Sequence, residues 1–252
     1  MADNDNREEL RKKALEKTRG DLKESVEKDR WIAKTVKFLD QNSNDFREEM
    51  ERFREIYSLH FPELVKEITD DEDLVKILER GVKKDELDAF SSMAESSTGT
   101  DITDDERQML ENMVAHLKQK MEINEELESY IKDSAREAMP NLEALLGPLV
   151  AARLVSLSGG LDELAKSPAS TIQVLGAEKA LFRYLHGKGT PPKHGVLFQH
   201  EYVNSLPEEK RGKMARFLAN KAAIAARLDN YGDKDKGEEL REEAREKYES
   251  LQ

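Results

Sequence analysis

An apolar seam without a helix breaker runs through the middle of this sequence. Its residues follow one another at steps of four, three and four before Asn124 takes the next seam position, and the apolar pattern then resumes. This is the spacing of one face of a coiled-coil helix. It predicts a helix over residues 104–138 and, with a second long helix beside it, an antiparallel helical hairpin. The seam residues are Leu110, Val114, Leu117, Met121, Leu127 and Ile131.

The flanking sequence supplies the rest of this hairpin. Thr103 and Glu106 stand in capping-box positions after a run of turn-forming residues, so the long helix is expected to begin there. Apolar residues recur at three- and four-residue spacing over 31–61, which predicts one or two amphipathic helices that end before Pro62. A further helix is expected over 71–93.

The composition changes at Pro140. From there to Leu157 the residues are apolar nearly all round, as in a helix that is buried on every side. We expect an all-α protein, in which a long coiled-coil helical hairpin is followed by a compact, mostly helical domain. The expected parts are a charged N-terminal segment (1–30), a helical coiled-coil domain (31–140), the compact domain (141–231) and a charged, solvated tail (232–252).

Several short elements are expected within the compact domain. A helix is predicted over 175–185, and the segment 187–195 must be a loop because it holds three glycines and two prolines. The brief apolar run at 195–200 is able to pair as a small strand. Ser205 begins a second capping box, which opens a helix that runs to about Asp229.

Basic residues are concentrated in the second half of an acidic chain. The net charge is −12, yet ten basic and four acidic residues between Lys166 and Lys221 give that segment +6 and leave −18 on the remainder. Such a distribution favours one surface for an anionic partner. Lys210, Lys213 and Arg216 are spaced three residues apart on one helix face, which can meet a phosphate backbone. The alternatives are a merely solvated face and a docking surface for an acidic protein.

Other classes of function find no support in the residues. Cysteine is absent, which excludes thiolate sites and is typical of an intracellular protein, and we expect a cytoplasmic one. The spacing of His186, His194 and His200 fits no common metal-ligand pattern, and His194 is better suited to stacking on RNA or hydrogen bonding to it. No nucleotide-binding loop, nucleophile elbow or membrane-length apolar stretch occurs. We therefore expect no catalysis, no cofactor, no metal and no membrane association.

Three blocks of the sequence resemble the Nop-domain family. They are RFREIYSLHFPEL (52–64), PNLEALLGPLVAARLVSLSGGLDELAKSPASTIQVLGAEKALFRYL (140–185) and KHGVLFQHEYVNSLPEEKRGKMARFLANKAAIAARLD (193–229). The resemblance is strongest with the archaeal core proteins of box C/D guide ribonucleoproteins. It implies that 141–231 is a Nop domain in a non-catalytic scaffold that supports guide-directed 2′-O-methylation of RNA.

The resemblance also implies partners. In this family the Nop domain binds a kink-turn in box C/D RNA together with the ribosomal-type protein already bound to that kink-turn, and the coiled coil forms a homodimer. With Lys210 added from the basic helix face, the residues expected to bind RNA are Lys193, His194, Gln199, Lys210, Lys213 and Arg216. The residues expected to contact the kink-turn protein are Gly176, Ala177, Glu178 and Lys179.

An N-terminal α/β domain recruits the methyltransferase fibrillarin in this family. Only about thirty residues precede Trp31 here, and most of them are charged or small. Their apolar content is too low to build such a domain. Whether the chain is a short form or a truncated piece, we do not expect it to bind fibrillarin by itself.

Overall fold

The structure is a computed structural model that describes residues 28–232 and 235–252. Every regular element in these residues is an α-helix or a 3-10 helix, and they form no strand. The prediction of an all-α fold is therefore confirmed. The expectation for the charged segment 1–30 falls almost wholly on residues outside the described part. Among the helices of the described residues, none is both long and apolar enough to cross a membrane.

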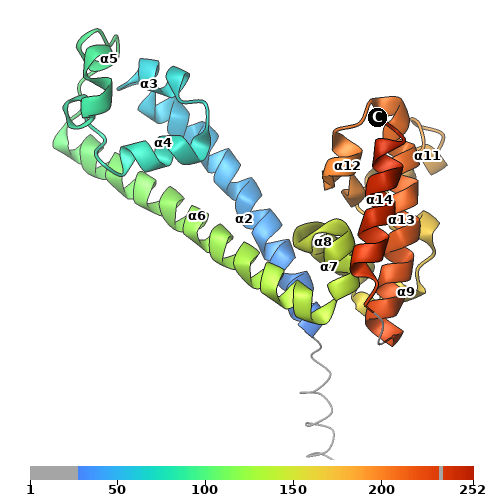
Figure 1. The fold of residues 1–252 in the computed structure, drawn as a ribbon. Coiled ribbons are helices and arrows are strands. Elements are labelled where there is room, and N and C mark those ends of the chain that lie inside the picture. The colour runs from blue at the N-terminus through green and yellow to red at the C-terminus, as the bar shows by residue number, and fades with distance from the viewer. Residues whose placement is uncertain (1–27, 233–234) are drawn as a thin grey trace, which may run out of the picture. The chain divides into compact units, whose positions relative to one another are not determined.

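The chain divides into two compact units. The first is formed by residues 38–129, and the second by the described residues on either side of it. The four-part division expected from the sequence stays a prediction. Helices α2 (Lys28–Tyr57) and α6 (Asp104–Ala138) contribute residues to both units. The first unit also holds α3 (Pro62–Glu67), α4 (Asp71–Leu78) and α5 (Ser91–Glu95), which Figure 1 labels, and the 3-10 helices η1 (Lys84–Glu86) and η2 (Asp88–Phe90).

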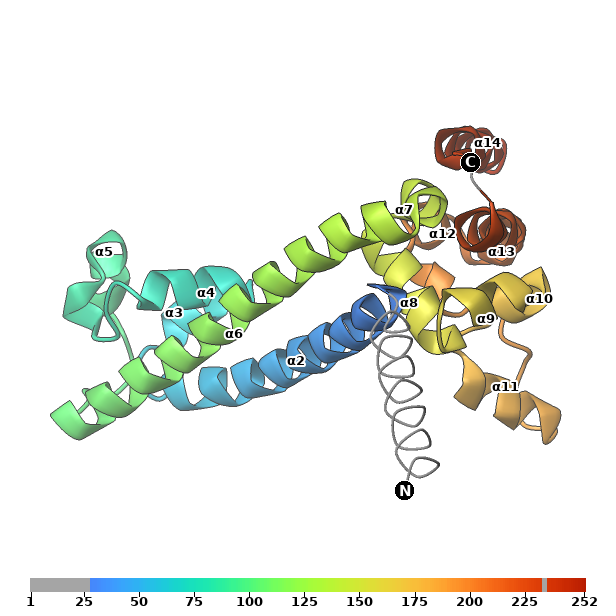
Figure 2. The same ribbon diagram turned by 90° about the horizontal axis from the view of Figure 1, so that it is seen from below.

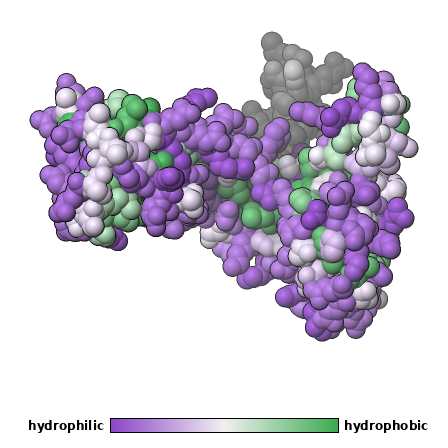
Figure 3. All heavy atoms as spheres, turned by 90° about the horizontal axis from the view of Figure 1, so that it is seen from above, coloured by the Kyte–Doolittle hydropathy of each residue, from purple (hydrophilic) through white to green (hydrophobic). Residues whose placement is uncertain are grey.

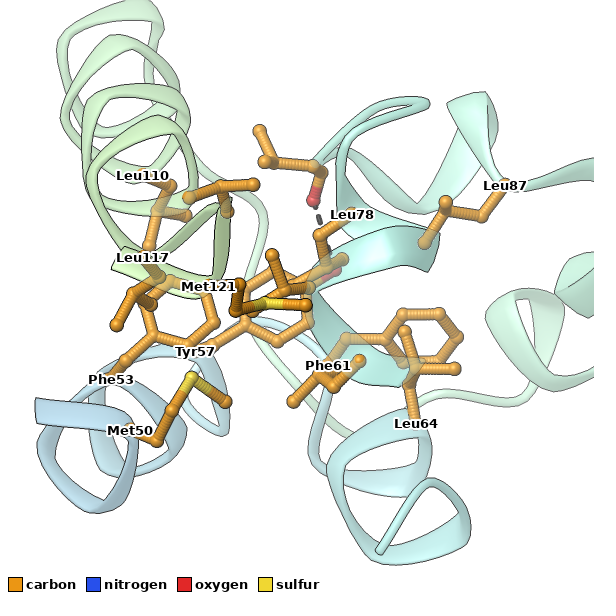
Figure 4. Close-up of a cluster of buried hydrophobic side chains, with 14 of the residues drawn as sticks. Met50, Phe53, Tyr57, Phe61, Leu64, Leu78, Leu87, Leu110, Leu117 and Met121 are labelled. Atoms are coloured by element: carbon orange, nitrogen blue, oxygen red, sulfur yellow. Dashed lines mark hydrogen bonds between the residues drawn. The ribbon is translucent and has the colours of Figure 1, made fainter. Parts of the chain in front are cut away.

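The seam of α6 builds the core of the first unit. Its residues from Leu110 to Met121 are buried, and they share one cluster with side chains of α2 such as Phe53 (Figure 4). At the polar seam position, the Asn42 side-chain amide donates a hydrogen bond to Asn124 Oδ1 at 2.8 Å. The apolar face of α6 is therefore covered by α2 and α4 of the same chain, and the side chain at its polar position has its hydrogen-bond partner on α2.

The prediction of a single helix over 71–93 is wrong. The chain leaves α4 and turns at Gly81, where a Cβ atom would lie 2.5 Å from the Glu86 Cβ. The Glu86 carboxylate accepts hydrogen bonds, each 3.1 Å long, from the backbone N–H groups of the two residues after this glycine. A side chain thus takes the place of the helical acceptors, so the helix does not continue.

The turn before α6 contains the predicted capping box. The Thr103 N–H donates to Glu106 Oε2 at 2.7 Å, and the Glu106 N–H donates to Thr103 Oγ1 at 3.3 Å. Earlier in the same loop, the Glu63 carboxylate accepts from the Thr98 N–H at 2.8 Å and from the Ser97 hydroxyl at 2.7 Å. These bonds, that from Thr98 first, lower the pKa of Glu63 to about 2 and fasten the loop to α3.

Short helices packed around one long helix make up the second unit. The long helix is α13 (Glu208–Tyr231), and α7, α9, α10 and α14 pack against it (Figures 1 and 2). Its inner face is rich in alanine, which allows these neighbours to come close. The other helices are α7 (Pro140–Leu146), α8 (Pro148–Ser158), α9 (Leu161–Lys166), α10 (Ala169–Ile172), α11 (Glu178–Leu185), η3 (Val196–Gln199), α12 (Glu201–Asn204) and α14 (Gly237–Glu249).

The apolar segment that follows Pro140 forms two helices instead of one. It breaks at Gly147, whose φ of +76° favours glycine, and the next residue is Pro148, which cannot donate within a helix. The first of the two helices is capped from a distance. Asp229, near the end of α13, accepts hydrogen bonds from two backbone N–H groups at the start of α7, each at 2.9 Å. The end of α13 is thereby tied to the start of α7.

The expected solvated tail is instead a packed helix, α14. It lies beside α13 in both views and contacts α7 as well (Figures 1 and 2). Leu240 and Ala244, one turn apart, are buried, and Gly237 approaches α7 so closely that a Cβ atom would lie 2.6 Å from that of Ala144. The Tyr248 ring stacks on an α12 aromatic at 4.7 Å. A narrow apolar stripe is enough to dock a helix whose other faces are charged.

Two local predictions near the basic segment are wrong, and a third, the helix over 175–185, is confirmed with a later start. The run at 195–200 forms the 3-10 helix η3 instead of a strand, because Gly195 and the residue after it bond to the backbone near Gln173 as single contacts rather than as a ladder. The Ser205 hydroxyl bonds to the Glu201 carbonyl at 2.6 Å, so no capping box forms and α13 begins after Pro207. The helix expected over 175–185 begins only at residue 178, since Gly176 has a φ of +85°.

Candidate nucleic-acid interface

The glycine- and proline-rich loop is fastened at its C-terminal end. The Gln173 side-chain amide donates to the Lys193 carbonyl at 2.7 Å, and the Gly195 N–H donates back to the Gln173 carbonyl at 2.9 Å. A Cβ atom at position 195 would lie 1.8 Å from the Leu175 carbonyl oxygen, so the loop depends on glycine at this point. The backbone at Lys193 is therefore held in a defined position.

Lys193 lies against α13. A Cβ atom on Gly212 would be 3.2 Å from the Lys193 Cβ, so the glycine on the helix makes room for the loop. Lys213 follows this glycine directly, and Arg216 lies about one turn farther along α13. The side chains of Lys193, Lys213 and Arg216 are all exposed. The structure thus places three of the expected RNA-binding cations on neighbouring surfaces of two elements.

His194 belongs to an aromatic and cationic stack. Its ring stacks on that of Phe198 with centroids 4.8 Å apart, and the Arg211 guanidinium lies 5.3 Å from the Phe198 centroid. Burial, followed by the nearby charges of Arg211 and Lys193, lowers the pKa of His194. A neutral imidazole on an aromatic support suits base stacking. Sequence reasoning missed Phe198 and Arg211, although Phe198 stands four residues after His194.

A basic pocket opens beside this stack. It has a volume of about 510 Å³ and lies between α11, the loop and the start of α13. Among its charged lining residues, three are cationic and one is acidic. Such a hollow has the charge to accept a phosphate-bearing ligand. Its charged and histidine residues are Arg183, Lys188, Lys193, His194 and Glu208.

Two expected RNA-binding residues have partners inside the chain. Lys210 is half-buried, and its ammonium donates to the backbone oxygen of Gln252 at 3.0 Å. Gln199 is exposed, and its Oε1 accepts a hydrogen bond from Arg153 Nη1 at 2.9 Å. Lys210 is therefore less open to an external phosphate than Lys213 or Arg216 on the same helix.

The four residues Gly176 to Lys179 form the entry to α11. The Gly176 N–H donates to Glu178 Oε1 at 2.7 Å, and the half-buried Ala177 precedes the first helical residue. Glu178 and Lys179 are exposed. α11 has no buried residue, and it exposes large apolar side chains, with Phe182 at 63%. An exposed apolar helix next to a charged turn has the character of a protein-binding surface.

The three neighbouring histidines serve different purposes. His186 bonds to the Phe182 carbonyl at 2.8 Å, His194 stacks as described, and the buried His200 caps α12 by accepting from the Tyr202 N–H at 3.1 Å. In the described part of the chain, no group of three or more histidines and acids is arranged to hold a metal ion.

The first unit has an apolar groove that sequence reasoning missed. It has a volume of about 740 Å³ and lies between α2 and α6. Ile56 and Met109 line it and are 38% and 44% exposed, while charged residues of both signs stand around them. Elsewhere, the face seen in Figure 3 is mostly hydrophilic, with small separate hydrophobic patches.

Known proteins resemble this chain along most of its length. Residues 38–250 match the model of the Nop family, described as "snoRNA binding domain, fibrillarin". Human nucleolar protein 56 is 34% identical over 240 residues, which are 87% of this chain and 40% of the human protein. Nucleolar protein 58 of Debaryomyces hansenii is 38% identical over 227 residues, 84% of this chain and 44% of its own. The chain thus spans less than half the length of these relatives.

The expectation of a cytoplasmic protein is wrong. The relatives from human, Debaryomyces hansenii and Schizosaccharomyces pombe are named as nucleolar proteins. The absence of cysteine could not separate these compartments, because thiols are kept reduced in the nucleus as well as in the cytosol.

A solved structure resembles the fold as well. A chain in the crystal structure of a fibrillarin/Nop5p complex has a TM-score of 0.57 and is 27% identical, and the match covers 96% of this chain and 78% of that one. The sequence match to the family model takes in both α6 and the helices around α13. The chain therefore belongs to the Nop family.

Proposed function

We propose that this chain is a non-catalytic scaffold of a box C/D-type ribonucleoprotein. Its second unit binds a kink-turn in the RNA together with the protein already bound to that kink-turn. The observation that carries the proposal is the group of exposed cations on α13 and the fastened loop, in a chain of the Nop family. Cations on a rigid helix and an anchored loop can meet phosphates at fixed separations.

The composite partner follows from the modest charge of this surface. An excess of +6 over the basic segment within a −12 chain gives too little attraction for tight binding to RNA alone. The exposed apolar residues of α11, beside the turn at Gly176 to Lys179, supply a second contact area for the kink-turn protein. Affinity then comes from the two areas together.

The scaffold has no chemistry of its own in this proposal. It supports guide-directed 2′-O-methylation by holding the RNA for a separate methyltransferase. The solved structure names fibrillarin as the partner of Nop5p, and the family description also carries that word. Whether this chain alone captures fibrillarin is tested by a pull-down with purified fibrillarin, and we expect none to be retained.

A gel shift on box C/D RNA tests the main proposal. The chain is titrated onto naked RNA and onto RNA already bound by the kink-turn protein. We expect at least a tenfold higher affinity for the protein-bound RNA, and weakening by salt in both cases. An RNA in which the kink-turn is replaced by a continuous duplex is the control. Equal affinity for naked and protein-bound RNA contradicts the proposal.

A further inference from the structure

The contact between Arg153 and Gln199 can form in only one orientation of the amide. Arg153 is on α8 and Gln199 is the last residue of η3, and Arg153 Nη1 lies 2.9 Å from Gln199 Oε1. A guanidinium has N–H donors and no acceptor, whereas a glutamine amide has an accepting oxygen at one end and a donating NH₂ group at the other. The hydrogen-bond network therefore settles which end of Gln199 faces α8.

The backbone around Gln199 is already held. The next residue, His200, is buried, and its N–H bonds to the Leu197 carbonyl at 3.2 Å. Its imidazole caps α12 by accepting from the Tyr202 N–H at 3.1 Å. With the backbone held on this side, the torsions of the exposed Gln199 side chain are the freedom that remains. Arg153 removes that freedom.

We propose that Arg153 is a positioning residue that turns the two amide donors of Gln199 outward, where they recognise a hydrogen-bond acceptor of the RNA. The inference rests on the proposed function, since it presumes that RNA meets this face. The Gln199 NH₂ group points away from Arg153 because its oxygen is engaged there. Without Arg153 the amide can rotate or flip, and binding must then order it again.

A different role for Arg153 would be direct contact with a phosphate, and the two roles leave different traces. A cation that neutralises a phosphate contributes to the slope of log affinity against log salt, by about 0.7 to 0.9 for each contact. A neutral amide such as that of Gln199 contributes nothing to this slope. A direct contact would also act independently of Gln199, so the two losses would add.

A double-mutant cycle with the full chain and the protein-bound box C/D RNA tests the inference. The variants are Arg153→Ala, Gln199→Met, which keeps the length of the side chain, and both together. We expect Gln199→Met to weaken binding about tenfold and Arg153→Ala about three- to tenfold. In the Gln199→Met background, Arg153→Ala should add less than about twofold.

Two further variants sharpen the test. Arg153→Lys keeps a donor and should recover most of the affinity. Gln199→Glu keeps an acceptor for Arg153 but has no donors to offer, so it should bind at least as weakly as Gln199→Met. The salt slope should be unchanged in Arg153→Ala, and the melting temperatures should be alike. Additive losses, or a smaller slope in Arg153→Ala, overturn the inference. Wild-type protein that fails to bind the complex at all refutes the proposed function instead.

Discussion

Lys193 and Arg216 are charged side chains at the surface of two different elements. Neither contributes to the core, so their replacement tests binding without testing folding. We expect Lys193→Ala and Arg216→Ala each to weaken assembly on the RNA bound by the kink-turn protein by about ten- to a hundredfold. If the proposed function holds, each substitution removes one charge-assisted hydrogen bond to a phosphate. A gel shift measures the affinity, and thermal unfolding should be that of wild type.

Leu218 provides the matched control on the same helix as Arg216. Its side chain is fully buried on the inner face of α13. Leu218→Ala should lower the free energy of unfolding by about 2–5 kcal/mol, because it removes buried methyl groups and leaves a cavity. Suppose instead that both charge variants bind like wild type and that Leu218→Ala is as stable as wild type. The face of α13 assigned to RNA binding and the face assigned to the core would then be reversed.

His200 gives the second unit a dependence on pH. Burial lowers the pKa of His200 from its ordinary value of 6.5, and Nδ1 must be unprotonated to accept from the Tyr202 N–H. The unfolded chain therefore binds the proton more readily than the folded one. The stability that neutral His200 contributes is present above pH 6.5 and is lost as the pH falls toward the lowered folded pKa.

The expected result is a fall in melting temperature between pH 7 and pH 5 that is smaller in His200→Asn. Asparagine is a good N-cap and does not titrate, so the variant keeps the helix start and removes the proton. Melting curves followed by circular dichroism measure both proteins across this range. Equal pH dependence in the two would mean that His200 is not the group responsible.

At the scale of elements, the packing of α14 depends on a small number of buried residues. Leu240 is 4% exposed and packs with Ala244 in an otherwise charged helix. We expect Leu240→Ala to lower the free energy of unfolding by about 2–5 kcal/mol. Glu246→Ala, at an exposed position of the same helix, should change it by less than about 0.5 kcal/mol. Similar melting temperatures for both variants would indicate that α14 contributes nothing to the unit.

The sequence predicted long periodic elements well and short ones poorly. The seam from Leu110 to Met121 is confirmed as buried because a repeated spacing reports the same packing several times. The break at Gly81 depends on Glu86, whose carboxylate reaches two backbone donors, and no periodicity shows that. The apolar stripe of α14 consists of very few residues among many charged ones, so its spacing did not indicate a packed helix face.

The residues of the candidate site were also predicted only in part. Local charge pointed to Lys213 and Arg216, which are exposed as a binding helix face requires. Contacts between segments far apart in the chain could not be predicted from the sequence. Arg153 meets Gln199 across 46 positions, and Lys210 meets the last residue of the chain across 42. Such pairings depend on the packed fold, and only a tertiary structure places them.

At the scale of the whole molecule, self-association cannot rest on the α6 seam. The family resemblance implies a homodimer through the coiled coil, but the seam face from Leu110 to Met121 is buried against α2 and α4 of the same chain. An apolar groove of about 740 Å³ lies between α2 and α6 within the first unit. Ile56 and Met109 stand open in it, and acidic and basic residues both line it. A surface with both signs of charge can face its own copy across a two-fold axis.

We therefore propose that the chain forms a homodimer through this groove. Replacing both Ile56 and Met109 by Glu should give a monomer at concentrations where wild type is a dimer, because two added negative charges from each chain would be buried in the interface. Light scattering over the micromolar range measures the mass. Ile224→Glu is the control, since Ile224 is 41% exposed on α13 of the other unit and should leave the dimer intact. A wild-type monomer at high micromolar concentration, or a dimer that survives the double substitution, contradicts this assignment.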